Sequence, residues 1–200
     1  MDNQFTLENF LQDTYAADPV KHRINIFNKV MNYPYQINGA RTIEKLIEQQ
    51  CGYCVPKARL LQDAYVKLGY KTKLCFVPFA FDMLALPEEF RDWGFASKKG
   101  YHTFIQLLVD DNRIDLDATF HPALKEWFQV NENWDGVSSQ KVIYPYNEVY
   151  VPQTQDEEYE VKNKLNDPAG RNTKDDEWIE KFNKWIIVQT EKINKDDVWV

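Results

Sequence analysis

Residues 52–69 read GYCVPKARLLQDAYVKLG, and this stretch indicates more about the fold than any other. Apolar residues recur along it at helical spacing, Pro56 suits a first helical turn, and Gly69 is placed to end a helix. We therefore expect a helix over Pro56 to Leu68, with Cys54 at its N-terminus. The recurring apolar residues are Val55, Ala58, Leu61, Tyr65 and Leu68.

The position of Cys54 is typical of a reactive thiol. The first N–H groups of a helix have no partner within it, and together with the positive end of the helix dipole they stabilise a thiolate, the nucleophilic form of sulfur. Cys75 differs, because it lies inside the apolar run 74–77 and is expected to be a buried, inert side chain. The sequence thus predicts that Cys54 is a nucleophile.

A β-hairpin is expected farther along the chain. Tyr101 to Val109 and Arg113 to Phe120 are rich in aromatic and β-branched residues, and the polar run 110–112 between them is a turn signal. A two-residue turn would pair positions whose numbers sum to an odd value, which places His102 and Asp117 on one face of the sheet. A three-residue turn would place them on opposite faces. The two-residue register would supply a thiol, an imidazole and a carboxylate, the groups that nucleophilic acyl transfer needs.

Other side chains compete for the roles of base and orienting acid. Asp115 shares the face of Asp117 in that register, but it lies farther from His102 along the strands. His121, which precedes Pro122 at a strand end, is the reserve base if the register is different.

At these residues the chain resembles the transglutaminase-like superfamily, whose core is papain-like. That family has a Gly-x-Cys opening a helix that ends in Leu-Gly, then a His followed two residues later by an aromatic residue, then Asp-x-Thr closing the next strand. The resemblance covers about residues 20–120. It implies a Cys-His-Asp triad in which Cys54 is the nucleophile, His102 the base and acid, and Asp117 the orienting carboxylate. The matching residues are Gly52, Cys54, Leu68, Gly69, His102, Phe104, Asp117 and Thr119.

The chain also departs from the family pattern. Phe104 stands where the family usually has Trp, Gln106 where it often has Glu, and residues 70–73 where a Pro-Ala-Arg-like stretch is common. These differences bear on substrate preference more than on the triad.

The expected fold class is α+β, with N-terminal helices and the nucleophile helix packed on an antiparallel β-sheet. At 200 residues the chain is long enough for one well-buried core, so a single domain over residues 1–200 is expected. Its transglutaminase-like core spans about 18–122, and residues 123–200 form a C-terminal extension. The predicted helices are Thr6 to Ala17, Pro19 to Asn32 and Thr42 to Gln50, and Lys71 to Ala80 is predicted as a strand.

The extension and one long loop are less regular. Residues 153–177 are polar and are expected to form a solvated connection. In the segment that follows, Trp178, Phe182, Trp185 and Gln189 fall on one helical face, which we expect to pack on the protein's own core. The aromatic loop 82–100 precedes the histidine strand, where it is expected either to wall a substrate cleft or to pack on the core.

Composition limits the partners and the compartment. A net charge of −7 disfavours a nucleic-acid or anionic-membrane surface and would attract a basic substrate more easily. Three cysteines are too few for a disulfide framework, residues 1–5 lack the features of a secretory signal, and the apolar run 74–81 is too short to span a bilayer. A cytoplasmic location is expected.

Three alternatives use the same residues. Cys51 and Cys54 form a Cys-x-x-Cys, but the thioredoxin-like redox fold needs a strand just before that motif, and residues 42–50 are predicted to be helical. A structural zinc site from Cys51, Cys54, Cys75 and His102 would lack the usual second Cys-x-x-Cys pair. A catalytically inactive module of the same fold could bind a peptide in its cleft without turnover.

The function predicted from the sequence is cysteine-dependent acyl transfer or hydrolysis at an amide bond of a peptide or protein. Water as acceptor would make the protein a peptidase or amidase, and an amine would make it a transamidase. No acidic spacing typical of a calcium loop is present in the sequence, so we expect neither a metal nor another cofactor.

Overall fold

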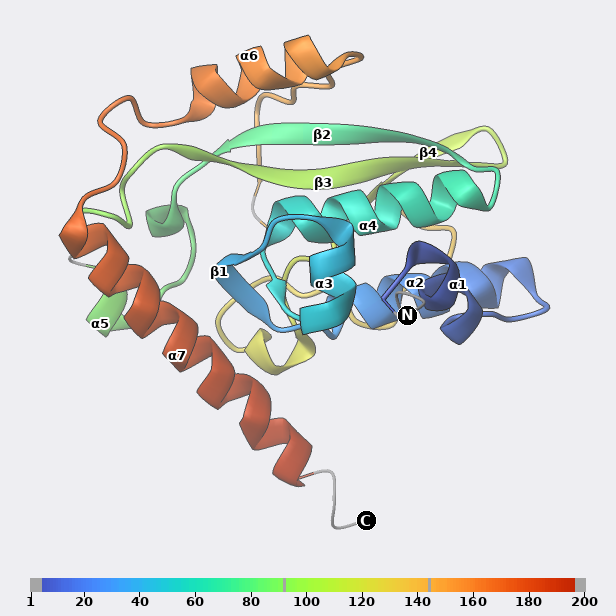
Figure 1. Cartoon of the computed structure of the whole chain (residues 1–200), viewed down its shortest axis with the longest axis horizontal. Helices are drawn as coiled ribbons and strands as arrows, with labels where there is room; N and C mark the ends of the chain where they lie inside the picture. Colours follow the sequence, from blue (N-terminus) through green and yellow to red (C-terminus); the bar gives the residue numbers. More distant parts are fainter. Residues whose placement is uncertain (1–4, 92, 144, 197–200) are drawn as a thin grey trace.

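The computed structural model describes residues 5–91, 93–143 and 145–196, without the side chains of 192–196. Within these residues the fold is α+β, with seven α-helices and one antiparallel sheet in the order β2-β3-β4 (Figure 1). The predicted helices and the predicted strand over 71–80 are present, with ends shifted by a few residues. The elements are α1 (Leu7–Asp13), α2 (Pro19–Met31), β1 (Tyr35–Ala40), α3 (Ile43–Gln49), α4 (Cys54–Lys67), β2 (Lys71–Phe79), η1 (Phe81–Met83), α5 (Glu88–Arg91), β3 (Gly100–Val109), β4 (Asn112–Leu116), η2 (Pro122–Leu124), α6 (Gln155–Leu165) and α7 (Thr173–Asp196).

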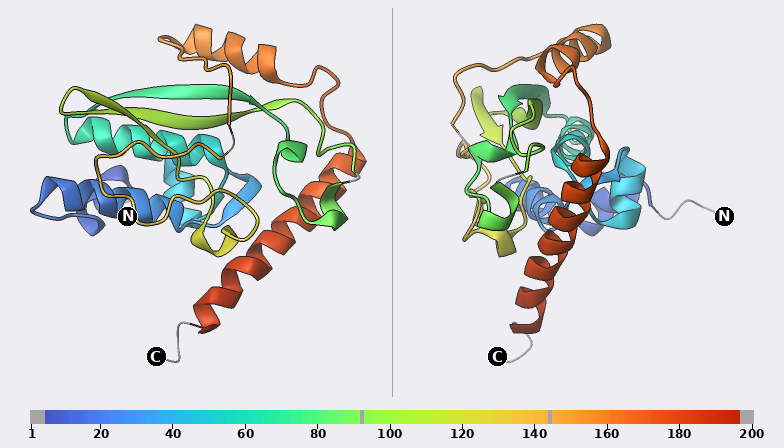
Figure 2. Two further views of the ribbon diagram at one scale, coloured as in Figure 1. Left: turned by 180° about the vertical axis from the view of Figure 1, so that it is seen from behind. Right: turned by 90° about the vertical axis from the view of Figure 1, so that its left-hand side faces the viewer.

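Helix α4 lies at the centre of a layered arrangement. It packs against one face of the β2–β3 ribbon, while α6 covers the other face and α2 contacts α4 from the far side (Figures 1 and 2). Burial of the apolar stripe of α4 explains this position, because a helix of this length is held mainly by tertiary packing. The main core includes Leu60, Leu61, Ala64, Tyr65, Leu74, Phe76, Ile105 and Leu107, each at most 4% exposed.

The hairpin has the two-residue turn on which the predicted site depends. Val109 pairs with Asn112, and Ile105 pairs with Leu116, so paired numbers sum to an odd value. Asp110 and Asp111 form the turn with φ values of 47° and 64°. Positive φ at both central residues is the feature of the type I′ turn, which Asp tolerates and which matches the twist of the two strands.

Strand β4 ends earlier than predicted, at Leu116 rather than Phe120. The Asp117 carboxylate accepts a hydrogen bond from the backbone N–H of Thr119 at 3.1 Å, and the carbonyls of Ala118 and Thr119 accept from the Lys57 ammonium. An aspartate that bonds its own backbone two residues on offers an alternative to the strand ladder. The chain therefore leaves the sheet at the candidate carboxylate.

The prediction of a solvated connection over residues 153–177 was wrong, because this segment contains helix α6. Thr154 caps the helix by accepting from the N–H of Glu157, acidic residues occupy the first turn, and Lys162 and Lys164 occupy the last. These charges complement the helix dipole. Val161 and Leu165 pack on the main core beside the sheet.

Helix α7 buries its aromatic face on the protein itself, as predicted. Trp178 and Phe182 are fully buried, Trp185 is half-buried, and Trp178 donates from Nε1 to the carbonyl of Phe90 at 3.1 Å. They belong to a second apolar cluster that also contains Tyr35 of β1, a strand that the sequence did not indicate. The C-terminal part of α7 extends away from the body of the molecule (Figure 2).

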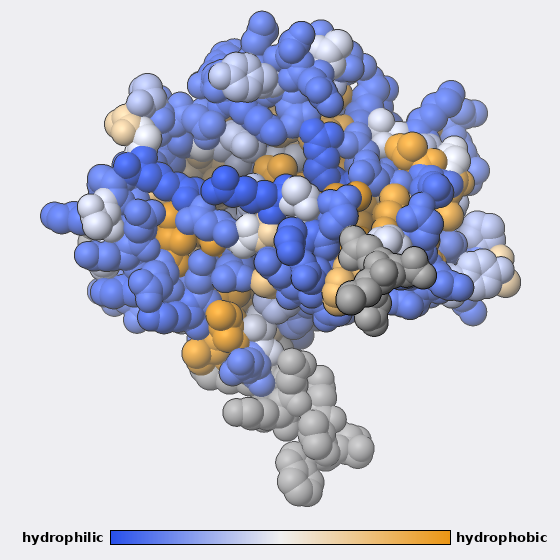
Figure 3. All heavy atoms as spheres, in the orientation of Figure 1, coloured by the Kyte–Doolittle hydropathy of each residue, from blue (hydrophilic) through white to orange (hydrophobic). Residues whose placement is uncertain are grey.

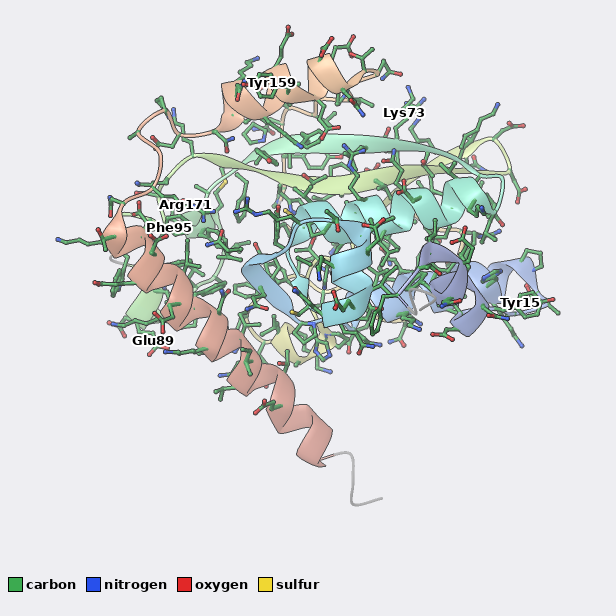
Figure 4. All side chains as sticks on the ribbon, viewed as in Figure 1. Tyr15, Lys73, Glu89, Phe95, Tyr159 and Arg171 are labelled. Carbon is green, nitrogen blue, oxygen red and sulfur yellow. The ribbon has the colours of Figure 1, made fainter. Side chains whose placement is uncertain are left out.

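We expect Trp178→Ala to lower the free energy of unfolding by about 3–5 kcal/mol, because it leaves a large cavity among stacked rings. Equilibrium urea unfolding followed by tryptophan fluorescence and circular dichroism would measure the change. Tyr159→Ala is the control, since Tyr159 is 68% exposed on α6 (Figure 4) and should change stability by less than about 0.5 kcal/mol. A loss in only one of two separate transitions would contradict a single cooperative domain.

None of the described helices has both the length and the hydropathy that crossing a bilayer requires. The face of the molecule in Figure 3 is mostly hydrophilic, with separated hydrophobic patches.

Candidate active site

Cys54 is the first residue of α4 and lines a cavity of about 560 Å³. Its side chain is only 7% exposed, so the cavity is its route to ligands. The chain reaches this position through Gly52, whose N–H donates to the carbonyl of Pro34 at 3.1 Å. A Cβ at Gly52 would lie 2.8 Å from Cδ1 of buried Leu46, so a larger residue would force either the Leu46 side chain or the turn that presents the thiol to shift.

His102 lies on β3 beside this thiol. Its Nε2 is 2.8 Å from Oδ2 of Asp117, and the Cys54 side chain lies close enough to the ring to influence its protonation. Phe104 lies nearly parallel to the imidazole, with the ring centroids 6.4 Å apart. Burial alone would lower the pKa of His102, but the Asp117 carboxylate and the Cys54 sulfur outweigh it and raise that pKa to about 10. The site therefore favours imidazolium.

Asp117 is held as an ion by three hydrogen bonds. Besides His102, the backbone N–H of Thr119 donates to Oδ1 at 3.1 Å and that of Ile143 to Oδ2 at 3.0 Å. Burial opposes ionisation, yet the imidazolium and these donors keep the pKa of Asp117 below its ordinary value. The structure thus places the Cys54 side chain beside His102 and joins His102 to Asp117 by a hydrogen bond.

Beside these three residues lies Lys57, a buried cation that sequence reasoning missed. It lies one turn after Cys54, is 1% exposed, and donates from Nζ to the carbonyls of Thr119, Ala118 and Met31 at 2.8, 3.2 and 3.5 Å. Burial lowers its pKa to about 7, although the charge of Asp117 opposes this. A lysine on the apolar face of the predicted helix was the signal, since lysine is rarely buried without a purpose. It ties the nucleophile helix to the backbone that follows Asp117.

The lowered pKa of Lys57 predicts a pH-dependent contribution to stability. Between pH 7 and about 10.5 the unfolded chain keeps the Lys57 proton while the folded protein releases it, so the contribution of Lys57 to the free energy of unfolding should increase as pH rises through this range. Lys57→Met removes the gain, and the difference in unfolding free energy between the two proteins should grow by at least about 1.4 kcal/mol, the equivalent of one pKa unit. Urea unfolding at pH 7, 8.5 and 10 would measure it. Lys67→Met, at an exposed position of α4, is the control, and a pH-independent difference for Lys57→Met would contradict the assignment.

The remaining candidates from the sequence have other roles. Asp115 accepts from Gln106 at 3.0 Å and from the Tyr146 hydroxyl at 3.1 Å, away from the imidazole. His121 accepts from the N–H of Ala123 at 3.0 Å, and burial lowers its pKa to about 4, so it caps η2 as a neutral ring.

The other two thiols are not placed as a second reactive group. Cys75 is completely buried, and burial raises its pKa to about 12. Half-buried Cys51 donates to Oε1 of Gln36 at 2.9 Å, and burial raises its pKa as well. All three cysteines are free thiols, and the residues before the Cys-x-x-Cys form helix α3, not the strand that a thioredoxin-like fold needs.

No group of three or more metal-ligating side chains occurs among the residues that the structure describes.

The cavity has aromatic walls and a rim from distant segments. Phe95, from the loop 82–100, lines the cavity, and Phe90 of the same loop packs on Trp178, so the loop both borders the cavity and packs on the core. Residues of β1 and of the linker 166–171 between α6 and α7 also line the cavity. The sequence did not indicate that either segment would take part. Other aromatic lining residues are Tyr35, Tyr53, Phe79, Phe81, Tyr101 and Phe120.

Comparison with known proteins does not assign the chain to a family. No model of a protein family matches the sequence, and no curated protein matches it. A solved structure described as "a Putative Cysteine Protease from Cytophaga hutchinsonii" is similar over 76% of this chain and 52% of its own, with 13% identity and a TM-score of 0.40. The chain thus spans about half the length of that protein.

Proposed function

We propose that this protein is a cysteine-dependent acyl-transfer enzyme of the transglutaminase-like, papain-like type that acts on amide bonds. The observation that supports the proposal is that Cys54 lies beside His102 at the wall of a ligand-sized cavity, and that His102 is hydrogen-bonded to Asp117. Each of the three side chains comes from a different element, so their meeting at the cavity needs more than local sequence.

In the proposed mechanism Cys54 attacks the substrate carbonyl as a thiolate paired with the His102 imidazolium. Because Nε2 of His102 faces Asp117, Nδ1 is the nitrogen left to exchange protons with sulfur and substrate. The imidazolium protonates the departing amine as the C–N bond breaks and a thioester forms. Asp117 fixes the orientation of the ring and stabilises its charge.

The start of α4 supplies the groups that would stabilise the tetrahedral intermediate. The first N–H groups of a helix lack partners within it, and Cys54 and Val55, the first two residues of α4, both line the cavity. These donors would bind the oxygen on which negative charge develops. The neutral imidazole then takes a proton from water or an amine, and this acceptor attacks the thioester and releases Cys54.

An activated ester tests the proposal without knowledge of the natural substrate. Incubation with p-nitrophenyl esters of short N-blocked peptides should acylate Cys54 in preference to Cys51 and Cys75, which peptide mapping by mass spectrometry would identify. The thioester should disappear on standing, with release of the acid in water. Addition of a primary amine should give an amide product in competition if the protein is a transamidase.

A persistent thioester without turnover would instead favour the inactive binding module. Acylation of Cys51 rather than Cys54, or of neither thiol, would contradict the proposal. Cys51 is not expected to react, because burial raises its pKa and its thiol is hydrogen-bonded to Gln36.

A further inference from the structure

The charged residues that line the candidate cavity are mostly basic, although the whole chain has a net charge of −7. Among the described lining residues, four besides His102 are cationic and one, Asp167, is acidic. The cations come from the β1–α3 turn, the loop before β3 and the α6–α7 linker, and the backbone brings them to one opening. The four are Arg41, Lys98, Lys99 and Arg171.

Two of these cations hold the linker in place. Lys98 donates from Nζ to Asp175 at 2.5 Å and to the carbonyl of Gly170 at 2.7 Å. Arg171 donates to Oδ1 of Asn38, and its guanidinium lies over the Phe95 ring, 5.8 Å from the centroid. Figure 4 shows Arg171 and Phe95 close together near the start of α7. These contacts account for Lys98 and, in part, for Arg171.

The other two cations have no such structural use. Arg41 and Lys99 are exposed, and within the described part of the chain neither side chain forms an ion pair or a side-chain hydrogen bond. Tyr53, which precedes the nucleophile, experiences the positive charges of both Arg41 and Arg171 together with the sulfur of Cys54. Arg41 and Arg171 therefore act on the residue next to the nucleophile.

We infer that the cavity selects peptides with a carboxylate close to the bond that is cleaved, and that Arg41 and Lys99 recognise this carboxylate. The inference rests on the proposed function. An arginine fork and a lysine ammonium at an aromatic-walled opening suit a carboxylate attached to an apolar chain. The net negative charge of the rest of the protein would repel such a peptide at long range, so the lining charges provide local selectivity.

Two alkylating reagents of nearly equal size but different charge test the electrostatic potential at Cys54 directly. Iodoacetate is an anion and iodoacetamide is neutral, and in both the thiolate forms a C–S bond while the C–I bond breaks and iodide leaves. The measured quantity is the rate constant of Cys54 for iodoacetate divided by its rate constant for iodoacetamide, both obtained by peptide mapping. We expect this ratio to fall about fivefold to tenfold in the double variant Arg41→Gln/Lys99→Gln at low ionic strength, and salt should reduce the effect.

The matched control is Lys71→Gln/Lys73→Gln, which removes the same charge from exposed positions of β2. Figure 4 shows Lys73 on the opposite side of the molecule from Arg171. Rapid labelling of Cys54 with an unchanged ratio in the cavity variant would overturn the carboxylate inference and leave the proposed function intact. A Cys54 that reacts with neither reagent would overturn both.

Peptide substrates then distinguish two sources of the carboxylate. Fluorogenic peptide amides with Glu or Gln beside the reporter bond test a side-chain carboxylate, and peptides with a free or an amidated C-terminus test a terminal one. In at least one of the two series the anionic peptide should have the higher kcat/KM in wild type, the series that shows this identifies the source of the carboxylate, and Arg41→Gln/Lys99→Gln should remove the preference. Equal kcat/KM within both pairs would contradict the inference.

Discussion

Replacement of Cys54 by alanine should reduce kcat/KM on a peptide amide or ester by about 10³-fold or more, with the fold unchanged. No other thiol can take its place, because Cys75 is sealed in the core and Cys51 points to Gln36. The substitution removes only one sulfur from a side chain at the cavity wall, so circular dichroism and the unfolding midpoint should stay close to those of wild type. Steady-state kinetics with active-site titration would measure the loss.

Cys51→Ala is the matched control for this experiment. If sulfur at position 54 is the nucleophile, the alanine at position 51 should leave kcat/KM within about threefold of wild type, since Cys51 makes one side-chain hydrogen bond and lies outside the triad. Equal losses in the two variants would instead support a redox role for the Cys-x-x-Cys. Turnover that persists in Cys54→Ala would exclude Cys54 as the nucleophile.

Asp117→Asn should lower kcat/KM roughly 10²-fold to 10⁴-fold, chiefly through kcat. Asp117 accepts hydrogen bonds from His102 and from the N–H groups of Thr119 and Ile143. An asparagine has one acceptor oxygen and an NH2 group that cannot accept, so at least one donor loses its partner or the imidazole turns. The change removes the largest influence that raises the pKa of His102, and burial is left to lower it.

The titration of His102 separates this positioning role from a general loss of structure. Imidazole ¹⁵N chemical shifts should give a pKa near 10 in wild type and a value several units lower in Asp117→Asn. Asp115→Asn is the control, because that carboxylate bonds Gln106 and Tyr146 instead of the imidazole. An unchanged His102 pKa in Asp117→Asn would contradict the electrostatic coupling between the two residues.

Local sequence signals predicted the elements that present the three side chains. The apolar spacing after Cys54 specified α4, and the polar residues at 110–112 specified a tight turn whose length fixes which face each strand residue occupies. The single choice between a two-residue and a three-residue turn decided whether Asp117 could meet His102. Because side chains alternate along a strand, this one local feature had a long-range consequence.

Contacts without a local signal could not be predicted. The N–H of Ile143 reaches Asp117 from 26 residues away, and any residue except proline has that donor, so no side-chain pattern marks it. Strand β1 forms only isolated bridges to Gly52, and it was missed for lack of a partner strand. Helix α6 was missed because the segment is mostly polar and was therefore interpreted as a loop, although Thr154 and Glu157 form a helix N-terminal cap.

The hydrogen bond from Ile143 to Asp117 also sets the smallest fragment of this protein worth expressing. A fragment that stopped near residue 122, where the family-like portion ends, would keep all three reactive side chains but would deprive the buried carboxylate of a backbone donor. It would also expose the aromatic surface that Trp178 and Phe182 now cover. The later part of the chain therefore contributes to the candidate site and to the core, and boundaries for recombinant production should lie beyond α7.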